Sequence, residues 1–381
     1  MTQDPSTPAA GLPLAGLRVL DLSRVLAGPL AAMTLGDLGA DVLKVERPGV
    51  GDDTRAWGPP FAEDGQSAYF RCVNRNKLGI AADLKDPVTV GRLRALVAGA
   101  DVVIDNFLPG VLDRAGLSPE RLLDEHPRLI WCTITGFGAE SARPGYDFVV
   151  QAESGWMSIT GPVEGPPHRV GVALADVLCG KDATIAILAA LAARHPTRRR
   201  LVLSLYGSAV AALINVAQNV LVSGAEARRW GNAHPNLCPY ELFGAADGPV
   251  VVAVGNDGQW QRCARAIGRE DLAIDARFLT NAGRLTHRTA LVAELSATFA
   301  SRPADDWVAV LDAAEVPTGR VRPVSQALAA AAGASAVTGL PSPVGGTVRF
   351  APPALGAHGD LVERYGWGAF GHVPARAPEQ P

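Results

Sequence analysis

The feature that most constrains the fold is a strand–helix–strand pattern near the start of the chain. Residues 17–22 and 41–46 each form a short apolar run typical of a buried strand. Between them, Pro29 suits the first turn of a helix that ends near Leu38. Two strands joined in this way lie parallel in one sheet and are linked by a right-handed crossover. The pattern therefore predicts a parallel α/β sheet.

The same alternation continues along the chain. Strands are predicted over 101–105 and 129–135, with helical stretches between them, which indicates an open sheet of Rossmann-like build. Ligands of such sheets bind at the carboxyl ends of the strands, where residues 23–27, Glu46–Arg47 and Asn106–Phe107 fall. No Gly-x-Gly-x-x-Gly motif follows the first strand, so a nicotinamide enzyme is disfavoured and no nucleotide cofactor is expected.

The predicted pattern of secondary structure changes at Tyr240. Before it, we expect a helix from Asp176 to about Arg194, a strand over 199–205 and a helix over 206–222. After it, a hairpin and three amphipathic helices indicate a smaller α+β domain. The tail is rich in Pro and Gly and shows no periodicity beyond about Leu361. The hairpin is expected over 240–254 and the helices over 259–267, 288–300 and 304–313.

Composition excludes several classes of protein. The 381 residues carry a net charge of −3 and no basic arm with interleaved aromatics, so a nucleic-acid partner is not expected. The apolar runs are shorter than the ~20 residues of a membrane helix, and residues 1–13 lack a signal pattern. The five cysteines and seven histidines show no ligand spacing, so no metal is expected. We therefore expect a cytoplasmic protein that does not enter membranes.

Asp176 lies alone in the uncharged stretch 171–180, just before the apolar run 183–193. It could be a helix N-cap, which contributes about 1 kcal/mol. It could also be a half-desolvated carboxylate that acts as a nucleophile. The stretch alone favours the cap, because caps are far more common than nucleophiles. Cys179, one turn away, is interpreted as a small buried hydrophobic residue.

A series of short blocks resembles the class III CoA-transferases, which include formyl-CoA transferase and carnitine CoA-transferase and have the α-methylacyl-CoA racemases as relatives. The resemblance covers about 14–358, and its specificity lies in the order and spacing of the blocks. Residues 73–77, 229–234 and 239–240 are most similar to the branch that moves CoA between dicarboxylic acids such as succinate and glutarate. The blocks are 18–22 with 27–29, 38–47, 51–55, 73–77, 106–110, 145–147, 171–180 and 254–259.

The resemblance implies an architecture. Family members have a large Rossmann-like domain and a small α+β domain, and two chains thread through each other as an interlocked homodimer. Here the large domain would be residues 1–228 with 318–381 returning to it, and the small domain would be 229–317.

The resemblance also reverses the preference at Asp176, which aligns with the family's catalytic aspartate. Its carboxylate would attack an acyl-CoA thioester to give a mixed anhydride and then an aspartyl-CoA thioester, with acyl-CoA as co-substrate and without ATP or metal. Gly255, Asn256 and Gly258 would form a loop that stabilises the oxyanion and shields the anhydride from water. The structural alternative is an ordinary helix start with Asp257 as the cap.

The implied CoA site gathers residues from several blocks. Leu26 stands where formyl-CoA transferase has Gln, which argues against a formyl or oxalate substrate. The residues are Val25, Leu26 and Ala27 beside the pantetheine, Arg47, Arg114 and Arg143 for the phosphates, Asp83, Leu84 and Lys85 near the adenine, Asn106 and Phe107 at the sheet edge, and Tyr146 with Asp147.

Two further functions stay open beside a CoA-transferase of dicarboxylic acids. An acyl-CoA racemase is disfavoured because Tyr146 replaces the family's histidine base, and a phenol is a weak base at neutral pH. A non-catalytic acyl-CoA-binding protein is the third reading. The second carboxylate of a dicarboxylic substrate needs a cation or hydrogen-bond donors. The candidates are Arg55, Arg75, Arg229 and His234, among which Arg75 and His234 are preferred.

Overall fold

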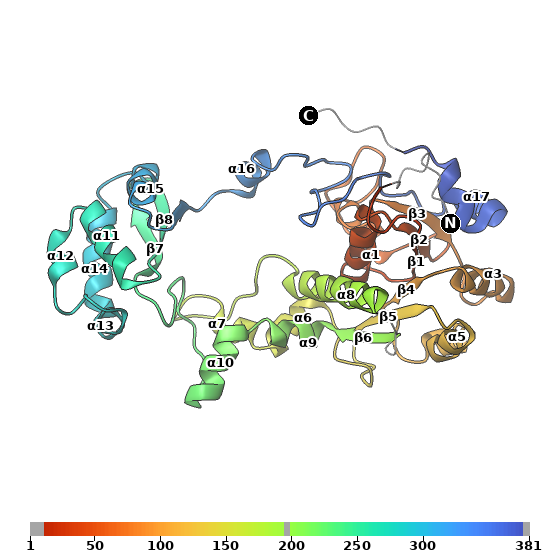
Figure 1. The fold of residues 1–381 in the computed structure, drawn as a ribbon, viewed down its shortest axis with the longest axis horizontal. Coiled ribbons are helices and arrows are strands. Elements are labelled where there is room, and N and C mark those ends of the chain that lie inside the picture. The colour runs from red at the N-terminus through yellow and green to blue at the C-terminus, as the bar shows by residue number, and fades with distance from the viewer. Residues whose placement is uncertain (1–10, 194–198, 376–381) are drawn as a thin grey trace. The chain divides into compact units, whose positions relative to one another are not determined.

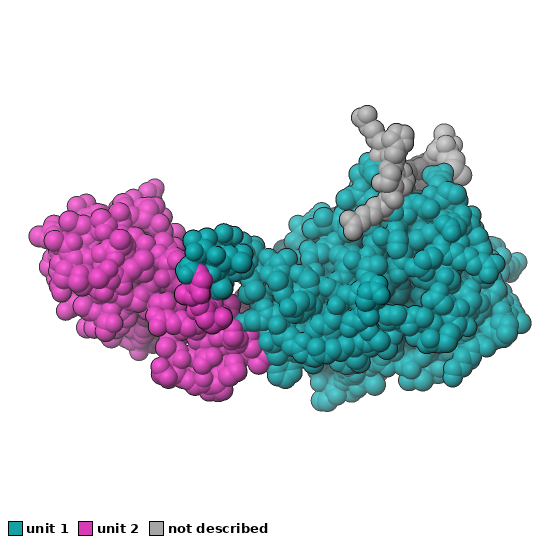
Figure 2. All heavy atoms as spheres, turned by 90° about the horizontal axis from the view of Figure 1, so that it is seen from below, with its two compact units in different colours: residues 1–156, 169–223, 331–381 teal, residues 157–168, 224–330 magenta. Residues whose placement is uncertain are grey.

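The computed structural model describes residues 11–193 and 199–375, which divide into two compact units (Figures 1 and 2). The first unit takes its residues from 1–156, 169–223 and 331–381, and the second from 157–168 and 224–330. Residues 318–330, placed in the large domain by sequence, group with the second unit. The division into functional domains stays a prediction.

The first unit is built on a six-stranded sheet in which every neighbouring pair is parallel. This confirms the α/β class. The strand over 77–81 was missed, because its Lys77 and Gly79 interrupt the apolar pattern. In the order β3-β2-β1-β4-β5-β6, the strands are β1 (Arg18–Asp21), β2 (Asp41–Glu46), β3 (Lys77–Ala81), β4 (Val102–Asp105), β5 (Ile130–Thr135) and β6 (Arg200–Ser204).

Both faces of the sheet are covered because the strands are apolar on both sides. Val19 packs against one layer of helices and Leu20 against the other. Figure 1 shows α3 (Pro87–Ala98), α5 (Pro119–Glu125) and α17 (Gly359–Tyr365) on one side. The opposite layer contains α1 (Ala27–Asp37), α6 (Asp147–Glu153), α8 (Leu174–Ala192) and α9 (Leu205–Ala211). Shorter or peripheral elements of this unit are η1 (Asp53–Ala56), α2 (Ala68–Arg71), α4 (Val111–Arg114), α10 (Ile214–Ser223) and η2 (Gly366–His372). Helix α7 (Trp156–Ile159) begins at the last residue of a first-unit stretch and continues into the second unit.

Helices α1 and α8 pack closely at a glycine. A Cβ placed on Gly180 would lie 2.6 Å from the carbonyl oxygen of Ala27. Only glycine therefore permits this approach without a shift of one helix. The contact sets the distance between the first turn of α1 and the first turns of α8, where Asp176 lies.

One prediction about a helix is wrong. The single helix expected over 206–222 is two helices, α9 and α10, separated at Ile214, whose φ of 38° interrupts the helix. The described part of the tail beyond Leu361, which shows no periodicity in the sequence, forms most of α17 and all of η2, and Val362 and Phe370 are buried in the core of the first unit. The expected helix end at Arg194 lies outside the described residues.

The chain returns to the first unit near its end and completes it. Phe350 is 5 % exposed, within the same core layer as α3 and α17, and its carbonyl accepts the amide of Asn76 at 2.9 Å. His358 covers the outer edge of β3, since its Nδ1 accepts from the Gly79 amide and its own amide donates to the Gly79 carbonyl. The returning segment thus pairs with an edge strand that would otherwise be open.

The second unit has its own antiparallel sheet and core. Trp260, Phe299 and Trp307 are at most 1 % exposed at the centre of that core. No single described helix is long and apolar enough to cross a membrane; one pair, α9 with α10, passes the length and composition test together but is bent by 68°. The elements are β7 (Tyr240–Ala245), β8 (Gly248–Ala253), β9 (Thr318–Arg320), α11 (Asp257–Ala266), α12 (Glu270–Ile274), α13 (Asn281–Thr286), α14 (Arg288–Phe299), α15 (Ala304–Ala313) and α16 (Val324–Ala329).

Candidate active site

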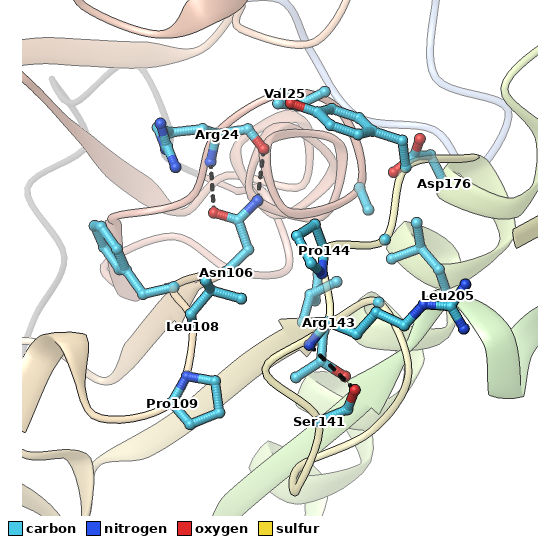
Figure 3. A pocket seen from close by; sticks show the side chains of 17 residues that line it. Arg24, Val25, Asn106, Leu108, Pro109, Ser141, Arg143, Pro144, Asp176 and Leu205 are labelled. Carbon is cyan, nitrogen blue, oxygen red and sulfur yellow. Dashed lines mark hydrogen bonds between the residues drawn. The ribbon is translucent and has the colours of Figure 1, made fainter. Parts of the chain in front are cut away.

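A cavity of about 230 Å³ opens at the carboxyl ends of β1, β4 and β5 (Figure 3). The sheet order reverses between β1 and β4, since β1 has β2 on one side and β4 on the other. This is the position at which open α/β sheets bind ligands. The lining includes Arg24, Val25, Asn106, Thr135, Tyr146 and Asp176.

Asp176 lies in the first turn of α8, is 9 % exposed and lines this cavity. It is not the N-cap of the helix, because that position is Ala173. A different carboxylate serves the helix start, since Asp147 Oδ1 accepts the amide of Ala175 at 2.8 Å. The cap interpretation is therefore wrong, and Asp176 is left without that structural role.

The environment of Asp176 favours a proton on it. Burial and then the nearby negative charge of Asp147 raise its pKa from 3.8 to about 7, while a hydrogen bond from the Ala27 amide opposes the rise. Ala27 is the first residue of α1, so the carboxylate faces the amide end of a second helix. Half of the Asp176 side chains are thus ionised near neutral pH, in a setting that hydrates the charge poorly.

Sequence reasoning missed Tyr69, which is part of the same surroundings. Burial, followed by the charge of Asp176, raises the pKa of the Tyr69 phenol to about 12, so it stays protonated as a hydrogen-bond donor. Its ring packs edge-on against Trp57 with the centroids 5.0 Å apart. No local pattern marks Tyr69, because it reaches Asp176 only through the fold. Cys179 is fully buried and burial raises its pKa to about 12, in agreement with a packing role.

Comparison with known proteins decides what this site belongs to. Residues 14–358 match the model of CoA-transferase family III. The chain belongs to this family. It is 45% identical to the succinyl-CoA:glutarate CoA-transferase of Mus musculus over 81% of this chain and 72% of that one. It is 43% identical to the succinate–glutarate CoA-transferase of Agrobacterium fabrum over 83% of this chain and 82% of the relative. A CAIB/BAIF family protein from Brucella suis has a similar crystal structure, with TM-score 0.82, 40% identity and coverage of 93% and 99%.

Membership of family III makes this chain an enzyme of the CoA-transferase type, with a CoA thioester as co-substrate. The fold brings together much of the predicted CoA site. Arg24 and Asn106 join two strand ends through reciprocal hydrogen bonds of 3.0 and 2.8 Å (Figure 3). Six predicted residues line the cavity with Asp176: Val25, Ala27, Asn106, Phe107, Arg143 and Tyr146.

Other predicted CoA residues of the first unit lie outside this cavity. Leu26 is 8 % exposed and belongs to the core. Arg47 pairs with Asp53 at 2.7 Å, and Arg24, which the sequence analysis did not single out, holds the other oxygen of Asp53 at 2.9 Å. Two guanidinium groups thus share one carboxylate at the edge of the site. Asp83, Leu84 and Lys85 follow β3, and Arg114 ends α4.

The structure does not support Arg75 as a substrate ligand. Its side chain is 2% exposed, and it binds both carboxylate oxygens of Asp37 and the carbonyls of Thr338 and Leu340. Arg55 is similarly engaged, because it pairs with Glu46 at 2.7 Å and stacks on Phe70.

Several predicted residues lie in the second unit. Arg229 there donates to the carbonyls of Pro162 and Gly165. His234 accepts the Asn236 amide, and burial and Arg288 lower its pKa. Gly255, Asn256 and Gly258 surround the start of α11, where Asn256, and not Asp257, is the cap. The role of this loop stays a prediction. Among the described residues, no group of three or more His, Cys, Asp or Glu side chains is placed to hold a metal ion.

The pKa of Asp176 predicts the pH profile of catalysis. A nucleophilic carboxylate must be ionised, so kcat/KM should rise about tenfold per pH unit below pH 7 and level off above it. The variant Asp147→Asn removes the neighbouring negative charge, so the pH at which kcat/KM is half-maximal should fall. The variant should also lose about 1 kcal/mol of stability, because the Gln151 amide loses its acceptor. Rates measured from pH 5 to 9 check this, and a midpoint unchanged by Asp147→Asn would contradict it.

Proposed function

We propose that this enzyme transfers CoA from succinyl-CoA to a small dicarboxylic acid of the glutarate class, with Asp176 as the covalent nucleophile. The observation that carries the proposal is the placement of Asp176, which is buried, faces a cavity at the switch point of the sheet and has no helix-capping role. The choice of acids rests on the relatives, which are named for succinyl-CoA or succinate and glutarate.

The proposed reaction consists of four acyl transfers. The Asp176 carboxylate attacks the thioester carbonyl, the C–S bond breaks, and CoA leaves as a thiolate. The thiolate attacks the aspartyl carbonyl of the mixed anhydride, which releases succinate and leaves an aspartyl-CoA thioester. The acceptor carboxylate then displaces the thiolate, and the thiolate returns to the acceptor acyl carbon and frees Asp176. Each step exchanges one activated acyl bond for another, so the thioester energy is conserved.

The surroundings of the cavity support this chemistry. The Ala27 amide is a donor already directed at the Asp176 carboxylate, and the protonated Tyr69 phenol lies close by. Such fixed donors stabilise the negative charge that develops on the oxygens during acyl transfer. Arg24 and Arg47, which share the Asp53 carboxylate, place guanidinium groups at the edge of the site, which suits the phosphates of CoA. Arg143 lines the cavity with its guanidinium paired to Glu153. In the second unit, Gly255, Asn256 and Gly258 are proposed to cover the anhydride.

Trapping the intermediate tests the proposal. After incubation with succinyl-CoA, hydroxylamine should convert Asp176 into a hydroxamate that peptide mass analysis locates. Asp182 lies further along the same helix, where it accepts a hydrogen bond from Ser208, and serves as the internal control. Glutarate should then be consumed at least about tenfold more efficiently than propionate. A turnover-competent sample with no modification of Asp176 would rule the mechanism out.

Racemisation is the second activity to separate. Because Tyr146 takes the place of the racemase histidine, we expect no incorporation of solvent deuterium at the α-carbon of a 2-methylacyl-CoA. Nuclear magnetic resonance of the recovered thioester measures this directly. Exchange at a rate comparable to CoA transfer would overturn the assignment.

We also propose that the chain acts as an interlocked homodimer in the cytoplasm. Large apolar side chains on α8 and α10 support the dimer, since Ile185 is 64% exposed and Leu221 and Val222 are each 77% exposed. In this assembly, the first unit carries the nucleophile and the CoA site, and the second unit carries the Gly255–Gly258 loop. Light scattering should give twice the mass of 39.7 kDa. A monomer that retains full activity would contradict the dimer.

A further inference from the structure

One residue at the rim of the cavity has an unfavourable backbone conformation. Val25 has a φ of 72°, a region that β-branched residues rarely occupy. Such a conformation costs about 1–3 kcal/mol and persists only where surrounding contacts enforce it. Val25 lies two residues before Ala27, whose amide meets the Asp176 carboxylate. The direction of that amide therefore depends on how Val25 is held.

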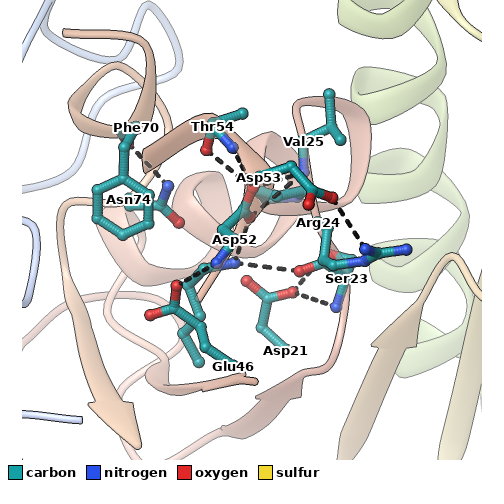
Figure 4. Close-up of polar contacts among 12 residues, drawn as sticks. Asp21, Ser23, Arg24, Val25, Glu46, Asp52, Asp53, Thr54, Phe70 and Asn74 are labelled. Carbon is teal, nitrogen blue, oxygen red and sulfur yellow. Dashed lines mark hydrogen bonds and ion pairs between the residues drawn. The ribbon is translucent and has the colours of Figure 1, made fainter. Parts of the chain in front are cut away.

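A buried ion pair holds it. Both carboxylate oxygens of Asp52 lie 3.3 Å from the Val25 amide (Figure 4). Asp52 also pairs with Lys44 Nζ at 3.0 Å. The side chains of Lys44 and Asp52 are both 0% exposed. Lys44 Nζ also donates to the carbonyl of Ser23 at 3.0 Å. The ion pair therefore binds the backbone on both sides of Arg24, at the Ser23 carbonyl and at the Val25 amide.

Asp52 is itself fixed from the opposite side. Its Oδ1 accepts from the amide and the hydroxyl of Thr54, and its own amide donates to Glu46. Lys77 binds residues on either side of this stretch of backbone, because its Nζ donates to the Pro29 carbonyl and to the Asp21 carboxylate. These contacts fix the segment before and after Ala27. A buried pair usually adds little net stability to a fold, so a positioning role accounts better for its presence here.

We propose that the buried Lys44–Asp52 pair is a positioning element of the active site, which keeps Val25 in its left-handed conformation and so directs the Ala27 amide at Asp176. The inference rests on the proposed function. Neither Lys44 nor Asp52 touches the reacting atoms. Their effect on catalysis passes through the backbone of residues 23–27, which provides a donor for the aspartyl oxygens at each covalent step.

A double-mutant cycle tests the proposal. In Asp52→Asn, an amide donor replaces the oxygen that accepts from Lys44 and one of the two oxygens that the Val25 amide faces, so kcat should fall about 10- to 100-fold. The pH at which kcat/KM is half-maximal should also rise, because the hydrogen bond from Ala27 to Asp176 weakens. The other groups around the carboxylate, Asp147, Tyr69 and Cys179, are unchanged. When Asp52→Asn is added to Val25→Gly, kcat should fall less than about threefold, because glycine adopts positive φ without strain.

A second buried pair provides the control. Asp37 binds Arg75 at 2.6 Å with both side chains at most 3% exposed, away from the cavity. Asp37→Asn should lower stability but leave kcat per folded molecule and the pH midpoint unchanged. Independent effects of Asp52→Asn and Val25→Gly, or an unshifted midpoint in a folded Asp52→Asn protein, would overturn the inference. Absence of the hydroxylamine adduct in the unmodified enzyme would instead count against the proposed function.

Discussion

Asp176→Asn should abolish CoA transfer and at the same time stabilise the fold above neutral pH. The amide oxygen can still accept from Ala27, but the side chain is no longer a nucleophile, so kcat should fall by at least about 10⁴-fold. The pKa of Asp176 is raised in the folded state, so the fold binds the proton more tightly than the unfolded chain. Stability is therefore lost as pH rises from about 4 to about 7, and the full penalty remains above that range.

Removing the charge removes this penalty. The free energy of unfolding of Asp176→Asn should exceed that of the original protein by roughly 2–4 kcal/mol at pH 8, and by roughly 2 kcal/mol less at pH 5. Urea unfolding at the two pH values, with single-turnover assays on the same samples, measures both effects. Equal stability of the two proteins at pH 8 would show that burying the Asp176 charge costs the fold little.

Gly180→Ala should damage the enzyme although alanine is the better helix former. The new Cβ would lie 2.6 Å from the Ala27 carbonyl oxygen, so α8 must move away from α1. Overpacking of this kind costs about 1–3 kcal/mol. Asp176 lies one turn earlier on α8 and would move away from the Ala27 amide, so kcat should fall about 10- to 100-fold.

Gly91 is the matched control. It lies within α3, and a Cβ there would meet nothing within 4 Å. Gly91→Ala should stabilise the protein by about 0.5–1 kcal/mol through helix propensity alone, with unchanged activity. Thermal unfolding and steady-state rates of the two variants make the comparison. Gly180→Ala with the stability and rate of Gly91→Ala would refute close packing at this contact.

The sequence predicted the elements whose pattern is local. The strands predicted over 41–46 and 101–105 and the helix predicted over 304–313 are plain from apolar periodicity, and the structure has them as β2 (Asp41–Glu46), β4 (Val102–Asp105) and α15 (Ala304–Ala313). The strand at 77–81 was not predicted, because its first residue is a lysine. That lysine is buried with its charge paired to Asp21, 56 residues away in the sequence, at 2.8 Å. No window of neighbouring residues contains that information.

The same distinction applies to the site. Asp176 stood out locally, since a lone carboxylate in an apolar stretch needs a reason. The cap interpretation fails because Asp147, 28 residues before Ala175 in the sequence, already accepts the amide of Ala175. Arg75 was expected to bind substrate, but its guanidinium is taken by Asp37 and two carbonyls of the returning segment. Both interpretations, Asp176 as a cap and Arg75 as a substrate ligand, are overturned by side-chain contacts between residues that are far apart in the sequence.

The late return of the chain to the first unit has a consequence during synthesis. When residue 330 leaves the ribosome, all six strands of the parallel sheet have emerged, but Phe350, Trp367 and Phe370 have not. Until they arrive, one apolar layer and the outer edge of β3 are open to neighbouring nascent chains. A molecule interrupted at this stage has Asp176 and most of its catalytic cavity, yet it is a target for chaperones and proteases rather than an enzyme.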